Sequence, residues 1–133
     1  MDAYIAAEAL LYLKAQASTS TKRNKSGLLL GHIRGRRFFV EGVYPCPEPD
    51  YASESGFWSL QEMFGHRIIG FYSSRSDGRA ASRLFQPFAC GKLFLRLGTL
   101  PRNRLSLQPL VIEFDGAFRL QPIPLSRPPR GSK

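Results

Sequence analysis

The sequence predicts an α+β domain, in which a mixed and largely antiparallel β-sheet is flanked by helices. Three observations predict this class. Apolar residues recur at helical spacing near the start of the chain, short apolar runs separated by Gly- or Pro-containing turns follow, and the last third holds three consecutive strand patterns. With 133 residues, 43% of them apolar and 22% charged, the chain has the size and composition of one globular domain with a real core.

The first part of the chain is expected to hold a helix and a hairpin. Residues 3–17 suit a helix, because their apolar side chains fall three or four positions apart and share one face. The polar stretch 18–26 is expected to be a loop. The runs SGLLLGHI and RRFFVEGVYP lie on either side of Gly35, which predicts two strands joined by a tight turn.

The middle of the chain is expected to return from a loop to the sheet. Proline cannot donate to a strand ladder, so a Pro-rich stretch ends the second strand and opens a loop to about residue 55. Residues 57–65 suit a short helix that ends at Gly65. RIIGFYS suits a third strand, and SDGRAASRLFQPF suits a turn with a helical turn near residues 79–86. The prolines of the loop are Pro45, Pro47 and Pro49.

The last part of the chain is expected to complete the sheet. The strand patterns are KLFLRLG, LSLQPLVIEF and AFRLQPIPL, and the last two are joined by a turn at Asp115 and Gly116. We expect a single domain over residues 1–125, followed by a basic, Pro-rich tail over residues 126–133 that is disordered.

The charge of the chain favours an acidic partner over a basic one. The net charge is +9 and the isoelectric point about 10.2, as found in proteins that bind nucleic acid, anionic membranes or acidic protein faces. The positive residues are spread along the chain, and no nucleic-acid-binding motif accompanies them. A solvated basic surface explains the same charge, so nucleic-acid binding stays an alternative without a motif behind it.

The cysteines and the apolar runs exclude several further classes. Cys46 and Cys90 lie far apart and favour two separate, buried or half-buried thiols over a disulfide. There is no Cys/His cluster of the kind a zinc finger needs. No apolar run reaches the roughly 20 residues of a membrane span. The apolar start is preceded by Asp2 and interrupted by Glu8 and Lys14, unlike a secretory signal. We therefore expect a cytoplasmic protein.

The order of these elements carries a resemblance. An N-terminal helix leads to GLLLG at residues 27–31, then to RGRRFFVEGVYP, a helix, IIGFYSSRSDG and the closing LVIEFDGAFRLQPIPL. Over residues 3–124 this succession resembles the JAB/MPN family, also called JAMM, of zinc isopeptidases and their inactive relatives. IIGFYSSRSDG is similar to the family's I-V-G-W-Y-H-S-H-P-x-G. The resemblance implies a cytidine-deaminase-like mixed sheet flanked by helices.

The resemblance also implies what has been lost. In active members an H-x-H pair and a downstream aspartate hold zinc, an upstream glutamate takes the proton of the zinc-bound water, and a serine helps to hold the intermediate. A guanidinium at a histidine position stays protonated and repels a metal ion. The resemblance therefore implies an inactive, metal-free member that needs no cofactor. It places these residues at the positions of the two histidines, the aspartate, the glutamate and the serine: Ser73 and Arg75, Gln86, Asn24, and Arg83 with Ser82 beside it.

Few other residues offer an alternative chemistry. The two histidines have no partner at ligand spacing and are interpreted as surface or packing residues, and a serine nucleophile would need a base and an oxyanion hole that the sequence does not indicate. The segments GLLLG and GHIRG lack a phosphate-cradle pattern and are interpreted as sites of tight packing or turns. The residues weighed in this way are His32, His66, Glu41, Asp77, Ser73 and Ser74.

The main hypothesis is a non-catalytic MPN-like domain that binds or scaffolds proteins. The resemblance implies a partner such as another MPN-type subunit, in a homo- or heterodimer, or a ubiquitin-like or peptide ligand. Divergent metallo-isopeptidase or peptidase activity and charge-driven nucleic-acid binding are the alternatives. For the two aromatic residues among the candidate partner-binding residues, core packing is the competing interpretation. The candidates are Arg75, Arg34, Arg36, Arg37, Phe57 and Trp58.

Overall fold

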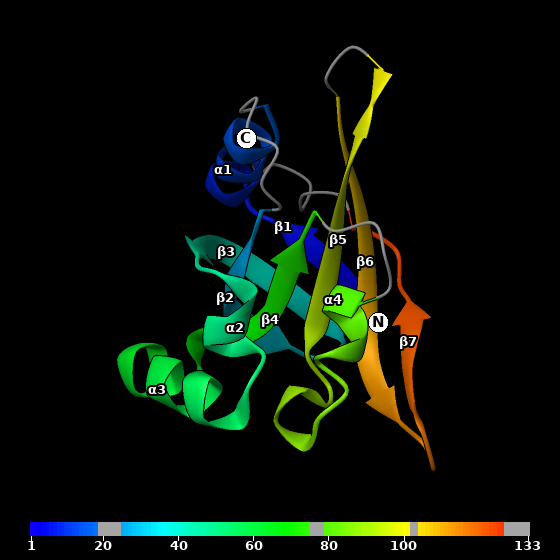
Figure 1. The fold of residues 1–133 in the computed structure, drawn as a ribbon. Helices are drawn as coiled ribbons and strands as arrows, with labels where there is room; N and C mark the ends of the chain where they lie inside the picture. Colours follow the sequence, from blue (N-terminus) through cyan, green and yellow to red (C-terminus); the bar gives the residue numbers. More distant parts are fainter. Residues whose placement is uncertain (19–24, 75–78, 102–103, 127–133) are drawn as a thin grey trace.

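The computed structural model describes residues 1–18, 25–74, 79–101 and 104–126. It has the predicted α+β class, with one seven-stranded sheet and helices on both faces (Figure 1). In chain order the elements are β1 (Asp2–Ile5), α1 (Ala7–Ser18), β2 (Ser26–Arg34), β3 (Arg37–Pro45), α2 (Glu48–Tyr51), α3 (Glu54–Phe64), a 3-10 turn (Gly65–Arg67), β4 (Ile68–Ser73), α4 (Arg79–Ser82), a second 3-10 turn (Pro87–Ala89), β5 (Leu93–Leu100), β6 (Arg104–Phe114) and β7 (Phe118–Pro122).

The sheet is mixed and curls back on itself. Its strand order is β1-β3-β2-β4-β5-β6-β7, with β1 parallel to β3, β4 parallel to β5, and the other neighbours antiparallel. After β7 the chain returns to β1: the Ala3 N–H donates to the Pro124 carbonyl at 3.1 Å, and the Ser126 N–H donates to the Ala3 carbonyl at 2.8 Å. The outer edge of β1 is thereby covered by the end of the described chain.

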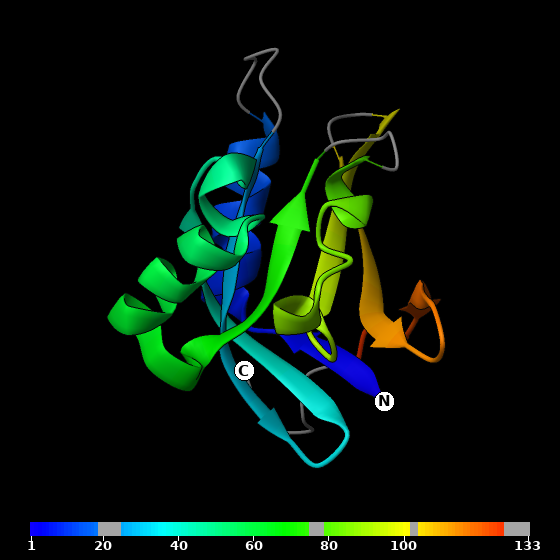
Figure 2. The same cartoon turned by 60° about the horizontal axis from the view of Figure 1, so that its bottom comes forward.

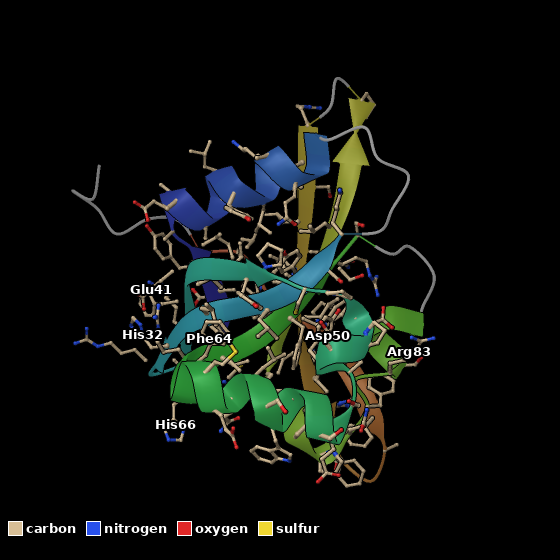
Figure 3. The ribbon with its side chains drawn as sticks, turned by 60° about the vertical axis from the view of Figure 1, so that its left-hand side comes forward. His32, Glu41, Asp50, Phe64, His66 and Arg83 are labelled. Carbon is tan, nitrogen blue, oxygen red and sulfur yellow. The ribbon has the colours of Figure 1, made fainter. Side chains whose placement is uncertain are left out.

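Two apolar clusters fill the two faces of the sheet. Successive residues of β2 alternate between them, because side chains along a strand point to opposite faces: Leu28 belongs to one cluster and Leu29 to the other. The first cluster lies under α2, α3 and the segment from α4 to the second 3-10 turn, and the second lies under α1. Figure 3 shows α1 on one side of the strands and α3 on the other. No helix of the described residues is long and apolar enough to cross a membrane.

The start of the chain corrects one prediction. Residues 3–5, expected to be helical, belong to β1 and pair in register with β3, with Ala3 opposite Phe38 and Ile5 opposite Val40. The Ala6 N–H then donates to the Val40 carbonyl at 2.8 Å, and the helix begins only at Ala7. Four residues with mixed apolar character fit the helical period as well as the strand period. They form a strand because the edge of β3 offers free backbone groups to pair with.

The Pro-rich loop is shorter than expected. A single helical turn, α2, lies within it, and α3 begins at Glu54, where the Ser53 side chain accepts the Gly56 N–H at 3.1 Å as an N-cap. The second 3-10 turn was also missed. A proline at the start of a helical turn loses no hydrogen bond, so Pro49 and Pro87 are compatible with these turns.

The remaining elements agree with the predictions. The β2–β3 hairpin turns at Gly35, with a φ of 60°, and the β6–β7 hairpin turns at Asp115 and Gly116, with a φ of 76° at the glycine. β4, the helical turn α4, and β5 to β7 lie where they were expected. Most of the predicted tail, residues 127–133, and most of the predicted polar loop, residues 19–24, lie outside the described residues.

The glycines of GLLLG and IIGFY are packing positions. A Cβ at Gly31 would overlap the Phe39 carbonyl oxygen, and a Cβ at Gly70 would overlap the Leu93 carbonyl oxygen. Neighbouring backbones approach so closely here that only glycine fits. The interpretation of GLLLG as a site of tight packing is therefore confirmed.

Candidate functional site

The start of β2, the end of β3 and the end of β4 lie together at one end of the strands. We call this place the site edge, and it consists of Lys25, Ser26, Cys46, Ser73 and Ser74. Ser26, at the start of β2, pairs with Ser73, at the end of β4. The Ser74 N–H donates to the Lys25 carbonyl at 2.8 Å, and the Lys25 N–H donates to Ser74 Oγ at 2.7 Å. The Cys46 N–H donates to the Ser26 carbonyl at 3.1 Å, which joins the end of β3 to the same place. The segments GLLLG and GFYS are therefore on neighbouring strands.

A second group of polar contacts joins α2 to the segment after α4. Gln86 Nε2 donates to the Ala52 carbonyl at 2.8 Å and to the Arg83 carbonyl at 2.6 Å. Arg83 Nη1 lies 3.0 Å from Glu48 Oε1, and Glu48 is only 8% exposed. A buried carboxylate is costly unless it is paired, so this contact fixes Arg83 against α2.

The structure describes three of the five positions that the resemblance singles out. Ser73 is buried at the end of β4, Arg83 is half exposed beside Glu48, and Gln86 holds two backbone carbonyls. Arg83 and Gln86 lie together, because the Gln86 side chain donates to the Arg83 carbonyl. Asn24 and Arg75 lie outside the described residues, as does Asp77.

A cavity of about 640 Å³ opens beside the site edge. Two hydrogen bonds fix its walls: Ser26 Oγ donates to the Cys46 carbonyl at 2.9 Å, and the Tyr72 hydroxyl donates to Gln16 Oε1 at 2.9 Å. The cavity lies between the end of α1, the start of β2 and the end of β3. It is lined by Tyr12, Ala15, Gln16, Lys25, Ser26, Pro45, Cys46 and Pro47.

Burial raises the pKa of one thiol and two phenols near this cavity. It raises the pKa of the Cys46 thiol to about 12, and the negative charge of Asp50 adds to the shift. Burial likewise raises the pKa of Tyr51 and of Tyr72, although in Tyr72 the hydrogen bond to Gln16 opposes it. A thiol nucleophile must be ionised, so the raised pKa disfavours Cys46 as a nucleophile at neutral pH. The site edge offers polar contacts rather than an activated nucleophile.

Both histidines lie away from the site edge. His32 is on β2 near the hairpin turn, where Nδ1 lies 2.6 Å from Glu41 Oε1 and the ring stacks on Phe39 with centroids 4.9 Å apart. His66 is exposed in the 3-10 turn after α3. Figure 3 shows His32, Glu41 and His66 on the side of the molecule opposite Asp50 and Arg83. Their interpretation as surface or packing residues is confirmed.

The donors at the described positions do not fit a zinc ion. Zinc in proteins takes imidazole, thiolate or carboxylate ligands. The two described ligand positions implied by the resemblance instead carry a hydroxyl at Ser73 and an amide at Gln86, and the implied serine position carries a guanidinium at Arg83. Within residues 1–18, 25–74, 79–101 and 104–126, no group of three or more His, Cys, Asp or Glu side chains is arranged to hold a metal ion.

The candidate partner-binding residues divide into two kinds. Phe57 is only 1% exposed and stacks on Phe88 with centroids 4.7 Å apart, so its interpretation as a partner contact is wrong and the core interpretation holds. This follows from its place on the buried face of α3. Trp58, the next residue, is 49% exposed. The three arginines of the hairpin turn gather at one small pocket and are considered below.

Several residues at or near the site edge were not predicted. Glu48 and Tyr51 lie in the stretch taken for a loop, and their burial became visible only when α2 packed on the sheet. Gln16 and Lys25 flank the polar segment between helix and strand, where sequence gives no periodicity. One signal was present: Cys46 lies between two prolines at a strand end, a common place for a pocket wall.

Comparison with known proteins identifies the fold but no family. No family model matches the sequence, and no curated protein matches it. Among solved structures, the chain is similar to a protein from Desulfitobacterium hafniense known from its solution structure, with a TM-score of 0.63 and 16% sequence identity. The match covers 95% of this chain and 94% of that one. At this identity the likeness shows a shared fold alone.

Proposed function

We propose that this chain is a non-catalytic, MPN-like domain that acts by binding a protein partner. The observation that carries the proposal is which side chains stand at the site edge and in the segment after α4. Three positions at which active members would hold metal or stabilise the intermediate carry Ser73, Arg83 and Gln86, and the last two are engaged in contacts with α2. Side chains that hold the fold together are not available to bind zinc.

The strand arrangement supports the same proposal. β2, with GLLLG, lies next to β4, with GFYS. The start of β2 and the end of β4 lie beside the cavity of about 640 Å³. An open, largely fixed cavity lined by Tyr12, two prolines and Lys25 suits a segment of a protein chain, because apolar walls with a few polar groups favour binding. The partner class is another MPN-type subunit, in a heterodimer or homodimer, or a ubiquitin-like or peptide ligand.

Metal analysis and a cleavage assay test the non-catalytic half of the proposal. The chain is purified without chelators, its zinc content is measured, and it is incubated with an isopeptide-linked ubiquitin substrate. We expect zinc well below one equivalent and no cleavage above the rate without protein. One equivalent of zinc together with cleavage would instead favour the metallo-isopeptidase alternative.

Site-directed cross-linking tests the binding half. A photo-reactive phenylalanine analogue replaces Tyr12, which lines the cavity, or Gln121, which is exposed on β7. In native host cells we expect a discrete protein adduct from the Tyr12 position and none from the Gln121 control. Equal labelling at both positions, or no protein adduct at all, would count against a partner at the site edge.

A further inference from the structure

The tip of the β2–β3 hairpin forms a second, separate feature of the molecule. It projects beyond the helices, with β1 alongside (Figure 2). A pocket of about 510 Å³ lies at this tip, at the other end of β2 from the site edge. It is lined by Met1, Asp2, Arg34, Arg36, Arg37 and Phe39.

One of the three arginines is committed to the fold. Arg37 Nε and Nη2 donate to the two carboxylate oxygens of Asp2 at 2.9 and 3.0 Å. The Asp2 N–H also donates to the Arg36 carbonyl at 3.0 Å, so the backbone of the tip is fixed to β1 from two sides. A fixed backbone lowers the entropy lost when a ligand binds.

The other two arginines carry uncompensated charge into the same pocket. Arg34 and Arg36 are exposed, and neither side chain forms a hydrogen bond or ion pair with another of the described residues. A guanidinium donates in a planar fork that matches the two oxygens of a carboxylate or a phosphate. Two such groups converging on a concave surface form an anion-binding arrangement.

The surroundings favour a protein segment over a nucleic acid. Base stacking needs a free aromatic face, but the Phe39 ring stacks on His32 and has the Arg37 guanidinium 5.9 Å from its centroid. The carboxylate of Asp2 also lines the pocket and is paired with Arg37, so two guanidiniums, those of Arg34 and Arg36, are left to hold an anion, which suits a segment with a few carboxylates. In a peptide, acidic side chains can stand opposite the arginines while other side chains are apolar. Met1 and Phe39 in the pocket wall offer contacts to such apolar side chains.

We propose that this pocket docks an acidic segment of a partner protein, with Asp or Glu carboxylates held by Arg34 and Arg36. The inference rests on the proposed function in that the chain acts by binding, and it names the chemistry of one partner surface. The pocket lies apart from the site edge, so the two proposals fail separately. Zinc-dependent cleavage would refute the proposed function, whereas the outcome of peptide binding decides only the present inference.

Peptide titration tests the inference. A short fluorescein-labelled peptide with Glu at alternate positions is titrated with the protein at low salt, and its anisotropy is followed. A peptide with Gln in place of Glu, inorganic phosphate as a competitor, and a single-stranded DNA of the same length are run in parallel. We expect the Glu peptide to bind, the Gln peptide not to bind, and the affinity to fall as salt is added.

A matched pair of variants locates the binding. The double variant Arg34→Ala, Arg36→Ala is expected to weaken Glu-peptide binding by about tenfold or more, since it removes the charge-assisted hydrogen bonds. The control Lys14→Ala, Arg104→Ala removes the same charge from exposed positions on α1 and β6 and is expected to retain most of the affinity. Thermal melting checks that both variants fold. Shifts of the arginine Nε–H signals on addition of peptide give a second measurement that needs no variant.

Four results would overturn the inference. The first is no binding of the Glu peptide at low salt. The second is an equal loss of affinity in both double variants, which would mean that net charge alone attracts the peptide. The third is a DNA strand that binds more tightly than the peptide and loses its affinity in the Arg34→Ala, Arg36→Ala variant, which would assign the pocket to nucleic acid. Displacement by phosphate alone at low concentration would mean that a single oxyanion, rather than a segment, is the ligand.

Discussion

The two ends of β2 differ in how their polar groups are used. At the Ser26 end, Lys25 and Ser74 bond to each other, and nearby Gln86 and Arg83 are bound to α2. At the other end, Arg34 and Arg36 project into a pocket without partners among the described residues. The difference teaches that the polar residues at the site edge and around α4 serve the fold, whereas the free charge lies at the hairpin tip.

The largest expected effect comes from a substitution in the middle of β2, which lowers the stability of the fold. In Gly31→Ala a Cβ would overlap the Phe39 carbonyl oxygen, so the backbone of β3 must shift. We expect a loss of about 3 kcal/mol or more in the free energy of unfolding. The control Gly42→Ala on β3 has open space around its Cβ and is expected to stay within about 1 kcal/mol of the wild type. Denaturant unfolding measures both; equal effects would mean that the close approach at Gly31 is not real.

The reactivity of the two cysteines sharpens the description of the site edge. Burial raises the pKa of Cys46 to about 12, so little of its thiol is ionised at neutral pH. Cys90, which was expected to be buried or half-buried, is instead exposed, because it follows the second 3-10 turn at the surface. We expect iodoacetamide to modify Cys46 at least about tenfold more slowly than Cys90 near pH 8. Peptide mapping by mass spectrometry gives both rates, and denatured protein serves as the control. Faster modification of Cys46 would indicate an activated thiol and reopen the question of catalysis.

A smaller effect tests whether Gln86 is structural. Gln86→Ala removes two hydrogen bonds to backbone carbonyls, for an expected loss of about 1–2 kcal/mol in the free energy of unfolding. The matched control Gln121→Ala changes an exposed residue of β7 and is expected to cost less than about 0.5 kcal/mol. Denaturant unfolding compares the two. If Gln86→Ala were neutral, the position would be free for a role other than holding α2.

The smallest expected effect concerns the ion pair at the hairpin tip. The hydrogen bond from Arg37 lowers the pKa of Asp2 below its ordinary value. A carboxyl with a lowered folded-state pKa stabilises the fold above its unfolded-state pKa, and this contribution disappears as pH falls through the lowered value. We therefore expect wild type to melt slightly higher than Asp2→Asn at about pH 6 and to lose this advantage progressively as the pH is lowered into the acid range. A difference that does not change with pH would show that the pair contributes nothing through charge.

The strand pattern could be predicted from the sequence because most of its signals are local. Gly35 and the Asp115–Gly116 pair mark hairpins by their turn chemistry, and the apolar runs mark buried strands. The start of the chain was assigned to a helix because four residues cannot distinguish the two periods. Its strand exists only because β3 offers a free edge, which is a property of the assembled sheet.

The candidate site could be predicted less well. Its strand ends were located through the resemblance, and Ser73 lies at the end of β4 as expected. The roles of Glu48 and Tyr51 depend on α2 packing against the sheet, and the approach of Gln16 to Tyr72 joins residues far apart in the sequence. Contacts of this kind follow from the tertiary fold, and a single sequence carries no local signal for them.

Zinc titration of a variant with zinc ligands at the positions implied by the resemblance, which we call the restored variant, tests most directly whether the resemblance identifies those positions correctly. The variant carries Ser73→His, Arg75→His and Gln86→Asp, and its control carries Ser74→His in place of Ser73→His. We expect one equivalent of zinc to bind to the restored variant, none to the wild type, and markedly weaker binding to the control, since tetrahedral zinc requires its ligands in one register. Circular dichroism confirms that each variant folds. A folded restored variant that binds no better than its control, or a wild-type chain that holds one equivalent of zinc, would contradict the account.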